Sequence, residues 1–285
     1  MTIRDSMRKK SDSITIKVNE RDRQVPPDTR ILDLKGELYP AADLIIFNGF
    51  PISENSSLND GDEVVFIAKG MIPDERELEC LMVARHSPGV HRRVKRSTVG
   101  IAGLGGLGSQ VAIALARIGL GTLILADYDV VEPSNLNRQQ YFIQQIGMPK
   151  VDAMRENLQR VNPYVRVITH RTVITPRNVQ DVFGKADIIV EAFDKAEEKA
   201  MLINAVSESM PDAYIVAASG VAGYGDSNAI RTTKFSSRIF IVGDQRSAAG
   251  PGVGLMAPRV GIAAHHQANI VLRLILGEEG DGSCS

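Results

Sequence analysis

The glycine-rich segment at residues 103–108 constrains the fold of this chain more than any other feature. Its sequence, GLGGLG, fits the pattern G-x-G-x-x-G and lies between an apolar run at 99–103 and a helical pattern at 109–119. Glycines between a strand and a helix allow a tight turn and let the backbone approach a phosphate at the helix N-terminus. Asp127 ends the next apolar run, where a carboxylate can accept hydrogen bonds from ribose hydroxyls. The segment therefore predicts nucleotide binding, without distinguishing among NAD, FAD and ATP.

The alternation of strand and helix continues through most of the chain. Apolar runs predict strands at 99–103, 122–127, 186–193, 213–219 and 238–243, and helical spacing predicts helices at 109–119, 150–161, 195–209 and 260–276. Near-continuous apolar strands separated by helices are typical of a parallel sheet covered on both faces. We therefore expect an α/β fold in which a Rossmann-like, mostly parallel sheet carries helices on both faces.

A smaller, strand-rich unit precedes this domain. Alternation with period two at 14–18 predicts a half-buried strand, apolar runs at 44–47 and 64–67 predict two more, and 29–38 predicts one short helix. We expect the chain to divide into a disordered tail at 1–12, a β-rich domain at 13–70, a helical connector at 71–98 and the nucleotide-binding domain at 99–285.

Composition excludes several classes of protein. The formal net charge is −1, so the chain lacks the basic excess expected of a duplex-binding domain. Its two cysteines, Cys80 and Cys284, provide neither a disulfide framework nor a C-x-x-C zinc site. Residues 1–10 are too polar for a signal peptide, and glycines and polar residues interrupt the apolar stretch at 99–126. We therefore expect a cytoplasmic protein without a membrane span, and we do not expect a nucleic-acid partner.

Charged residues after the predicted strands favour ATP chemistry. Arg138 and Lys150 follow the strand at 122–127, and a guanidinium and an ammonium near the glycine turn have no evident role in a dehydrogenase. An enzyme that breaks the bond between α- and β-phosphate needs them, because negative charge builds on the phosphate oxygens. Asp194 follows the strand at 186–193, where a carboxylate near a triphosphate can hold Mg²⁺. Taken singly, the two cations also suit a solvated surface, and Asp194 suits a helix N-cap.

Four segments together resemble one protein family. GLGGLGS, LADYDVVEPSNLNRQQY, GMPKV and EAFD, in this order and spacing, are similar to the ThiF/MoeB group of ubiquitin-activating-like adenylyltransferases, over about residues 85–276. Residues 216–220, 223–225 and 254–259 resemble the ThiF-like subgroup named for thiamine synthesis. The resemblance implies an enzyme that uses ATP and Mg²⁺ to adenylate the C-terminal glycine carboxylate of a small sulfur carrier such as ThiS.

The resemblance also implies roles for particular residues. The glycine turn is expected to cradle the nucleotide, Asp127 to hold the ribose and Asp194 to coordinate magnesium. Members of the family are usually homodimers in which an arginine reaches the partner's site, and Arg85 is the candidate here. The implied nucleotide and phosphate ligands are Gly103, Gly105, Gly106, Gly108, Asn135, Arg138 and Lys150.

Two departures from the family pattern concern cysteine. Many relatives carry paired C-x-x-C zinc ligands, and some carry a cysteine that takes part in sulfur transfer, yet residues 81–283 contain no cysteine. We therefore expect no zinc, a reaction that stops at the acyl-adenylate, and a separate protein as sulfur donor. Cys80 is interpreted as a small buried hydrophobic residue, and His265 and His266 as structural residues.

The N-terminal unit resembles a carrier rather than an enzyme. ITIKVNERDRQV, LIIFNGFPI and LNDGDEVVFIAKG are similar to a ThiS-type β-grasp, ubiquitin-like domain. A working carrier ends in Gly-Gly with a free carboxylate, whereas Gly70 here continues into Met71 and is an internal residue. Three interpretations follow: a docking or dimer-stabilising module, an autoinhibitory substrate mimic, or a precursor that is cleaved.

The leading hypothesis is ATP-dependent adenylation of a separate ThiS-like carrier, in thiamine thiazole biosynthesis. One alternative is adenylation of a carboxylate carried by tRNA, against which the near-neutral charge counts. A second is a NAD-dependent oxidoreductase, although no His or Tyr acid is evident near the glycine turn. A third is a scaffold that binds the carrier without catalysis, suggested by Lys195 and Lys199, where relatives often have Asn and Arg.

Overall fold

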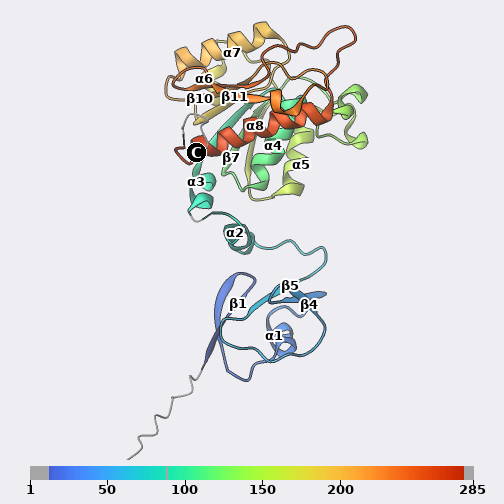
Figure 1. Cartoon of the computed structure of the whole chain (residues 1–285), viewed down its shortest axis with the longest axis vertical. Helices are drawn as coiled ribbons and strands as arrows, with labels where there is room; N and C mark the ends of the chain where they lie inside the picture. Colours follow the sequence, from blue (N-terminus) through green and yellow to red (C-terminus); the bar gives the residue numbers. More distant parts are fainter. Residues whose placement is uncertain (1–12, 88, 279–285) are drawn as a thin grey trace, which may run out of the picture. The chain divides into compact units, whose positions relative to one another are not determined.

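The computed structural model describes residues 13–87 and 89–278, and the chain forms two compact units, Met1–Ser87 and Pro88–Ser285 (Figure 1). The predicted tail at 1–12 and Cys284 lie outside the described residues. No helix among those residues is both long and apolar enough to cross a membrane.

The N-terminal unit is a β-grasp fold, as predicted. Its mixed sheet has the strand order β2-β1-β5-β3-β4, with β1 and β5 parallel, and one helix packs against it. Its elements are β1 Ile14–Val18, β2 Arg21–Val25, α1 Ile31–Leu38, β3 Leu44–Phe47, β4 Phe50–Ile52 and β5 Glu63–Ile67. Ile16, Val18, Ile31, Leu34 and Phe66 form the centre of its core.

Two of these strands carry no clear sequence signal. β2 reads RDRQV, and only its last residue is buried, so its pattern is that of a polar edge. β4 is three residues long and contains Pro51, which removes a backbone donor and suits an edge strand. The tight turn between β1 and β2 places Asn19 and Glu20 at φ 46° and 63°.

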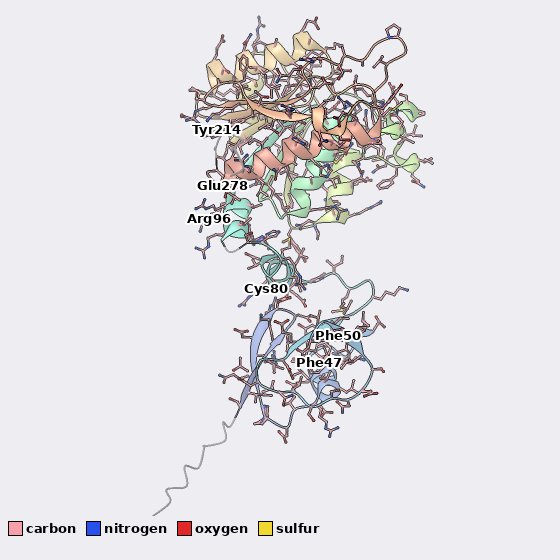
Figure 2. All side chains as sticks on the ribbon, in the orientation of Figure 1. Phe47, Phe50, Cys80, Arg96, Tyr214 and Glu278 are labelled. Atoms are coloured by element: carbon pink, nitrogen blue, oxygen red, sulfur yellow. The ribbon has the colours of Figure 1, made fainter. Side chains whose placement is uncertain are left out.

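The segment at 71–98, expected to be a helical connector, contains two helices. α2 Glu75–Val83 begins after Asp74, whose side chain accepts a hydrogen bond from the Glu77 amide, and α3 Val90–Arg96 begins after Gly89, at φ 82°. Cys80 lies on α2 (Figure 2). It is half-buried rather than buried, and its thiol lies against the Arg21 guanidinium, which corrects the interpretation of Cys80 as a buried hydrophobic residue.

The C-terminal unit is the predicted Rossmann-like α/β fold. Its seven-stranded sheet has the order β11-β12-β10-β9-β6-β7-β8, in which β11 alone of these strands is antiparallel to its neighbour. The strands are β6 Thr98–Ala102, β7 Thr122–Ala126, β8 Arg166–His170, β9 Ile188–Glu191, β10 Tyr214–Ala218, β11 Arg231–Lys234 and β12 Ile239–Gly243. The helices after α3 are α4 Gly106–Arg117, α5 Lys150–Val161, α6 Val179–Phe183, α7 Ala196–Ser209 and α8 Ala257–Ile275.

Alternate residues of each central strand build two separate cores. Ile101, Leu125 and Val190 face the layer of α4, α5 and α8, whereas Ala102 and Ile189 face α6 and α7 (Figure 1). The predicted helices and strands are present, and β8, α6 and β11 are additional. β11 reads RTTK and is exposed along its whole length, so hydrophobic periodicity cannot reveal it.

The strand order creates a crevice at one edge of the sheet. β6 and β9 are neighbours at its centre, but β6 is followed by α4 on one face and β9 by α7 on the other. In open α/β sheets, ligands bind beyond the carboxyl ends of strands at such a switch point.

Candidate nucleotide-binding site

A cavity of about 760 Å³ opens at the carboxyl ends of the strands in the C-terminal unit. Its walls are contributed by the segments that follow β6, β7, β8, β9, β10 and β12 and by the starts of α5, α7 and α8. The predicted site residues that line it are Gly103, Gly105, Gly106, Asp127, Asn135, Arg138, Lys150 and Asp194. The structure therefore gathers side chains that are widely spaced in the sequence around one volume large enough for a small-molecule ligand.

The space that a Cβ atom would occupy differs among the glycines of the turn. Gly103 has φ +91°, and a Cβ there would lie 2.8 Å from the Ala192 carbonyl oxygen. A Cβ on Gly108 would overlap the Gly103 carbonyl oxygen, so Gly108 is required for α4 to pack against the turn. A Cβ on Gly105 would meet Gln139 Nε2 only at 3.9 Å. The space beside Gly105 is thus open to the cavity, where a ligand can approach the backbone.

Asp127 ties the glycine turn to the end of β7. Its Oδ2 accepts a hydrogen bond from the Leu104 amide at 2.6 Å, and its Oδ1 accepts one from the Asp129 amide at 2.8 Å. Burial raises the pKa of the Asp127 carboxyl, and the Lys150 ammonium opposes that rise. The carboxylate therefore orders the turn in addition to lining the cavity.

Two cations lie on the same wall. Arg138 follows the 3-10 helix η1 Pro133–Asn137, and its Nη1 donates to Asn137 Oδ1 at 2.8 Å and to the Ser134 carbonyl at 3.3 Å. Its Nε is buried and has no hydrogen-bond partner within the described part of the chain. Lys150, the first residue of α5, is buried, and its Nζ lies 2.9 Å from Asp129 Oδ2. Asp129 was not identified from the sequence.

Asn135 stabilises the loop that forms this wall. It is buried, and its Oδ1 accepts a hydrogen bond from the Glu132 amide at 3.1 Å, which closes a capping box at the start of η1. The side chain therefore fixes the loop that presents Arg138.

Asp194 lies in the turn between β9 and α7 and is exposed to the cavity. The N-cap of α7 is Lys195, so the alternative interpretation of Asp194 as the N-cap is wrong. Within residues 13–87 and 89–278 no three acidic, His or Cys residues cluster as a metal centre. Asp194 nevertheless fits the way proteins bind Mg²⁺, which usually takes one or two carboxylates together with substrate phosphates.

A buried ion pair lies beside Asp194 and was missed by sequence reasoning. Glu191, the last residue of β9, is 0% exposed, and Lys199 Nζ lies 3.0 Å from both of its carboxylate oxygens. The same carboxylate accepts hydrogen bonds from the Phe193 amide at 2.7 Å and the Ala218 amide at 3.4 Å. Burial raises the pKa of Glu191, and Lys199 opposes the rise. The pair connects the Asp194 turn to the end of β10.

The opposite wall of the cavity is uncharged and built mostly from small residues. It consists of Ala218, Ser219, Gly220, Val221, Ala222, Ser247, Ala248, Ala249 and Leu255. The cavity thus has a charged, glycine-containing wall on the side of β6 and β7 and a neutral wall on the side of β10 and β12.

The remaining candidates lie elsewhere. Arg85 belongs to the N-terminal unit, where its exposed guanidinium is 3.8 Å from Glu20 Oε1, and its role in a partner subunit's site stays a prediction. His265 Nδ1 lies 2.8 Å from the Gly261 carbonyl and His266 Nδ1 lies 3.2 Å from Thr232 Oγ1. These contacts are internal to the fold and suit a structural role.

Solved structures share the fold of the C-terminal unit. The tRNA N6-threonylcarbamoyladenosine dehydratase TcdA of Escherichia coli, in complex with ATP, has a TM-score of 0.65 at 22% identity, covering 74% of this chain and 100% of that one. Escherichia coli MccB, in complex with ATP, has a TM-score of 0.52 at 22% identity, covering 73% of this chain and 72% of that one.

Curated relatives match the chain over a shorter stretch. Ubiquitin-like modifier-activating enzyme 5 of Caenorhabditis elegans is 38% identical over 129 residues, which are 41% of this chain and 31% of the relative. The probable adenylyltransferase/sulfurtransferase MoeZ of Mycobacterium tuberculosis is 36% identical over 104 residues, which are 36% of this chain and 26% of the relative. The chain thus covers about a third or less of the length of these relatives.

Family models match parts of the chain in both units. The model of ThiS-like ubiquitin matches residues 14–70, and the model of the ThiF family matches residues 79–284. With its switch-point cavity and glycine turn in place, the chain belongs to the ThiF family and carries a ThiS-like ubiquitin domain ahead of the ThiF domain.

Proposed function

We propose that this protein is an adenylyltransferase that uses ATP to activate the C-terminal glycine carboxylate of a separate ThiS-like sulfur carrier. The observation that carries the proposal is the convergence of the glycine turn, Arg138, Lys150 and Asp194 on one cavity. Membership of the ThiF family supports it, as do the named activity of MoeZ and the ATP complexes of TcdA and MccB.

The reaction requires charge neutralisation rather than a protein nucleophile. A carboxylate oxygen of the carrier attacks the α-phosphorus of ATP, the bond from that phosphorus to the bridging oxygen breaks, and pyrophosphate leaves with the electron pair. Arg138 and Lys150 stabilise the negative charge that develops on the phosphate oxygens. The buried, unpaired Nε of Arg138 supports this role, because it offers a donor that a phosphate oxygen can satisfy. Asp194 would hold Mg²⁺, which supplies further charge neutralisation when bound.

The rest of the cavity suits the nucleoside. Asp127 lies at the end of β7, where a carboxylate meets ribose hydroxyls in this class of fold. Val130, Val173 and Ile174 provide apolar lining next to it, which fits the faces of an adenine ring.

We also propose the following assembly. The active form is a homodimer to which Arg85 contributes across the interface, the sulfur comes from a separate donor protein, and the pathway is thiamine thiazole synthesis. Residues 13–70 act as a docking or dimer-stabilising module, 71–98 as a connector and 99–285 as the adenylyltransferase domain. The absence of cysteine at 81–283 supports a reaction that ends at the acyl-adenylate.

ATP–pyrophosphate exchange tests the proposal. We expect exchange that depends on a carrier ending in Gly-Gly and falls about 10²–10³-fold in Arg138→Ala, Lys150→Ala and Asp194→Asn. Arg117→Ala is the matched control, since Arg117 is exposed in the last turn of α4 and does not line the cavity. Exchange that is unchanged in the three site variants would refute the proposed mechanism.

The likeness to TcdA favours one second candidate, activation of a carboxylate carried by tRNA. A tRNA gel shift at physiological salt separates the two. Binding of tRNA together with tRNA-dependent exchange would support the second candidate, and exchange that needs only the protein carrier would exclude it.

A further inference from the structure

Hydrogen bonds join three segments behind the neutral wall of the cavity: the loop after β10, the turn after β12 and the first turn of α8. The Ser219 amide donates to the Val242 carbonyl at 2.8 Å, and the Asp244 amide donates to the Gly220 carbonyl at 2.9 Å. A Cβ on Gly220 would overlap Asp244 Oδ1, so the two turns interlock without space for a larger residue. The Ala222 amide completes the connection by donating to Ser247 Oγ at 3.2 Å.

An ion pair holds the centre of this arrangement. Arg259, in the first turn of α8, has a side chain 5% exposed, and its Nη2 lies 2.7 Å from Asp244 Oδ2. Its Nη1 donates to the carbonyls of Gly225 at 2.7 Å and Asp226 at 3.0 Å. One guanidinium therefore joins α8 to the turn after β12 and to the loop after β10. A planar fork of donors can do this, whereas the compact ammonium of lysine cannot reach all three acceptors.

The second carboxylate oxygen of Asp244 bonds the segment that leads into the neutral wall. Asp244 Oδ1 accepts hydrogen bonds from the Arg246 and Ser247 amides, both at 2.8 Å. Ser247, Ala248 and Ala249 follow directly and line the cavity. The position of the neutral wall is thus set by a charged pair that lies behind it.

The two walls divide the cavity by chemistry. The groups suited to phosphate, ribose and Mg²⁺ lie on the wall of β6, β7 and β9, whereas the cavity-lining residues in the two loops that the Arg259–Asp244 pair holds carry no charge. If the charged wall takes ATP, the neutral wall is left for the molecule whose carboxylate is adenylated. Most of its side chains are short, which leaves backbone hydrogen-bonding groups and space for an extended peptide.

We propose that Arg259 and Asp244 are positioning residues for the acceptor: by fixing the loops at 219–226 and 244–249, they set the apparent KM for the carrier, while the affinity for ATP depends on the opposite wall. This inference rests on the proposed function. Neither residue lines the cavity, so both act through the loops that they hold.

Steady-state exchange kinetics on the full chain test the inference. We expect Arg259→Gln to raise KM for a Gly-Gly carrier by about 10- to 100-fold, because loosening the two loops removes binding contacts that the acceptor makes in the ground state and the transition state alike, and a loss of that kind raises KM. The Kd for ATP, measured by calorimetry without carrier, should change less than about twofold. Arg259→Lys should give an intermediate KM, since it keeps the charge beside Asp244 and loses part of the fork.

A second measurement distinguishes a local change in the two loops from loss of folding. Asp244→Asn keeps the size of the side chain, and hydrogen exchange should show faster exchange at the Ala222 and Ser247 amides, with the Leu104 amide of the glycine turn unchanged. An unchanged carrier KM in variants that remain folded, or equal losses for ATP and carrier, would overturn the inference alone. Absence of carrier-dependent exchange in the unaltered protein would instead refute the proposed function, and the inference with it.

Discussion

Replacing Lys199 with Met removes the ammonium that faces a fully buried carboxylate. Glu191 is 0% exposed and receives both of its short ionic contacts, at 3.0 Å, from Lys199. Removing one partner of a buried pair typically costs about 3–5 kcal/mol, because the remaining charge stays buried without compensation. The Lys199 side chain is 22% exposed, so water from the cavity can replace part of its contribution. We therefore expect the lower end of that range, about 3 kcal/mol, or roughly 6–12 °C in Tm for a domain of this size.

The destabilisation has a definite dependence on pH. Burial raises the pKa of Glu191 above its ordinary value of 4.5, so at pH values between the unfolded and the folded pKa the folded state holds a proton that the unfolded state has released. The free energy of unfolding then falls as pH rises from the unfolded pKa to the folded pKa. Lys199 is one of the groups that lower the folded pKa, so its removal extends this window upward. The difference in Tm between Lys199→Met and the unaltered protein should therefore grow as pH increases above about 5.

Thermal unfolding followed by circular dichroism at several pH values measures this effect. Lys195→Met is the matched control, because Lys195 is 60% exposed and pairs with Glu198 at the surface, where such a pair contributes less than about 1 kcal/mol. The double variant Lys199→Met with Glu191→Gln should recover much of the lost stability and its dependence on pH should be weaker. A Tm within about 2 °C of the unaltered protein at pH 8, or a double variant no better than Lys199→Met, would show that the pair is not a buried charge pair in solution.

The remaining predictions concern glycine, an acidic side chain and a turn. Gly105→Ala should leave Tm unchanged and weaken ATP binding in calorimetry, whereas Gly108→Ala should lower Tm, since its Cβ would overlap a backbone carbonyl; equal effects on Tm would contradict this assignment. Burial acts to raise the pKa of Asp244, but hydrogen bonds from two backbone amides and a guanidinium outweigh it and lower the pKa to about 2. The stabilisation from Asp244 is therefore complete above its ordinary value of 3.8 and is lost as pH falls towards 2, so acid unfolding of Asp244→Asn should depend less steeply on pH in that range. Asn19→Ala should lower the free energy of unfolding of the N-terminal unit by about 2 kcal/mol, because the buried Asn19 side chain hydrogen-bonds the amide and carbonyl of Phe66 and the residue has positive φ. Thermal unfolding of the full chain measures this loss, and an unchanged N-terminal transition would contradict the prediction.

Elements with regular hydrophobic patterns could be predicted from the sequence. β6, β7, β9 and β10 are apolar and buried throughout most of their length, so their composition alone identifies them as strands of a covered parallel sheet. Edge strands such as β2, β8 and β11 could not be identified in this way, because water contacts much of their surface and polar residues are tolerated there.

The site was predicted where a residue follows the end of a strand in the sequence. Asp127 and Asp194 are such residues, and the topology of a parallel sheet brings them to one edge. Ion pairs between residues of different elements had no comparable signal in the sequence. The pairing of Lys199 with Glu191 and that of Arg259 with Asp244 join different elements, and nothing in the spacing of these residues indicates that they meet. A glutamate inside an apolar strand, as in ADIIVEAF, was the one available hint that a buried cation lies nearby.

The switch point at β6 and β9 also separates the cavity along the chain. The charged wall comes from residues up to the first turns of α7 and the neutral wall from residues after the middle of β10, so each wall is encoded by its own contiguous stretch. The two stretches touch where Val260 packs beside Gly106. Mutations that alter what the neutral wall accepts can accumulate in one stretch of the gene while the other keeps its chemistry. A fold arranged in this way can acquire new acceptors by local divergence and retain the same nucleotide throughout.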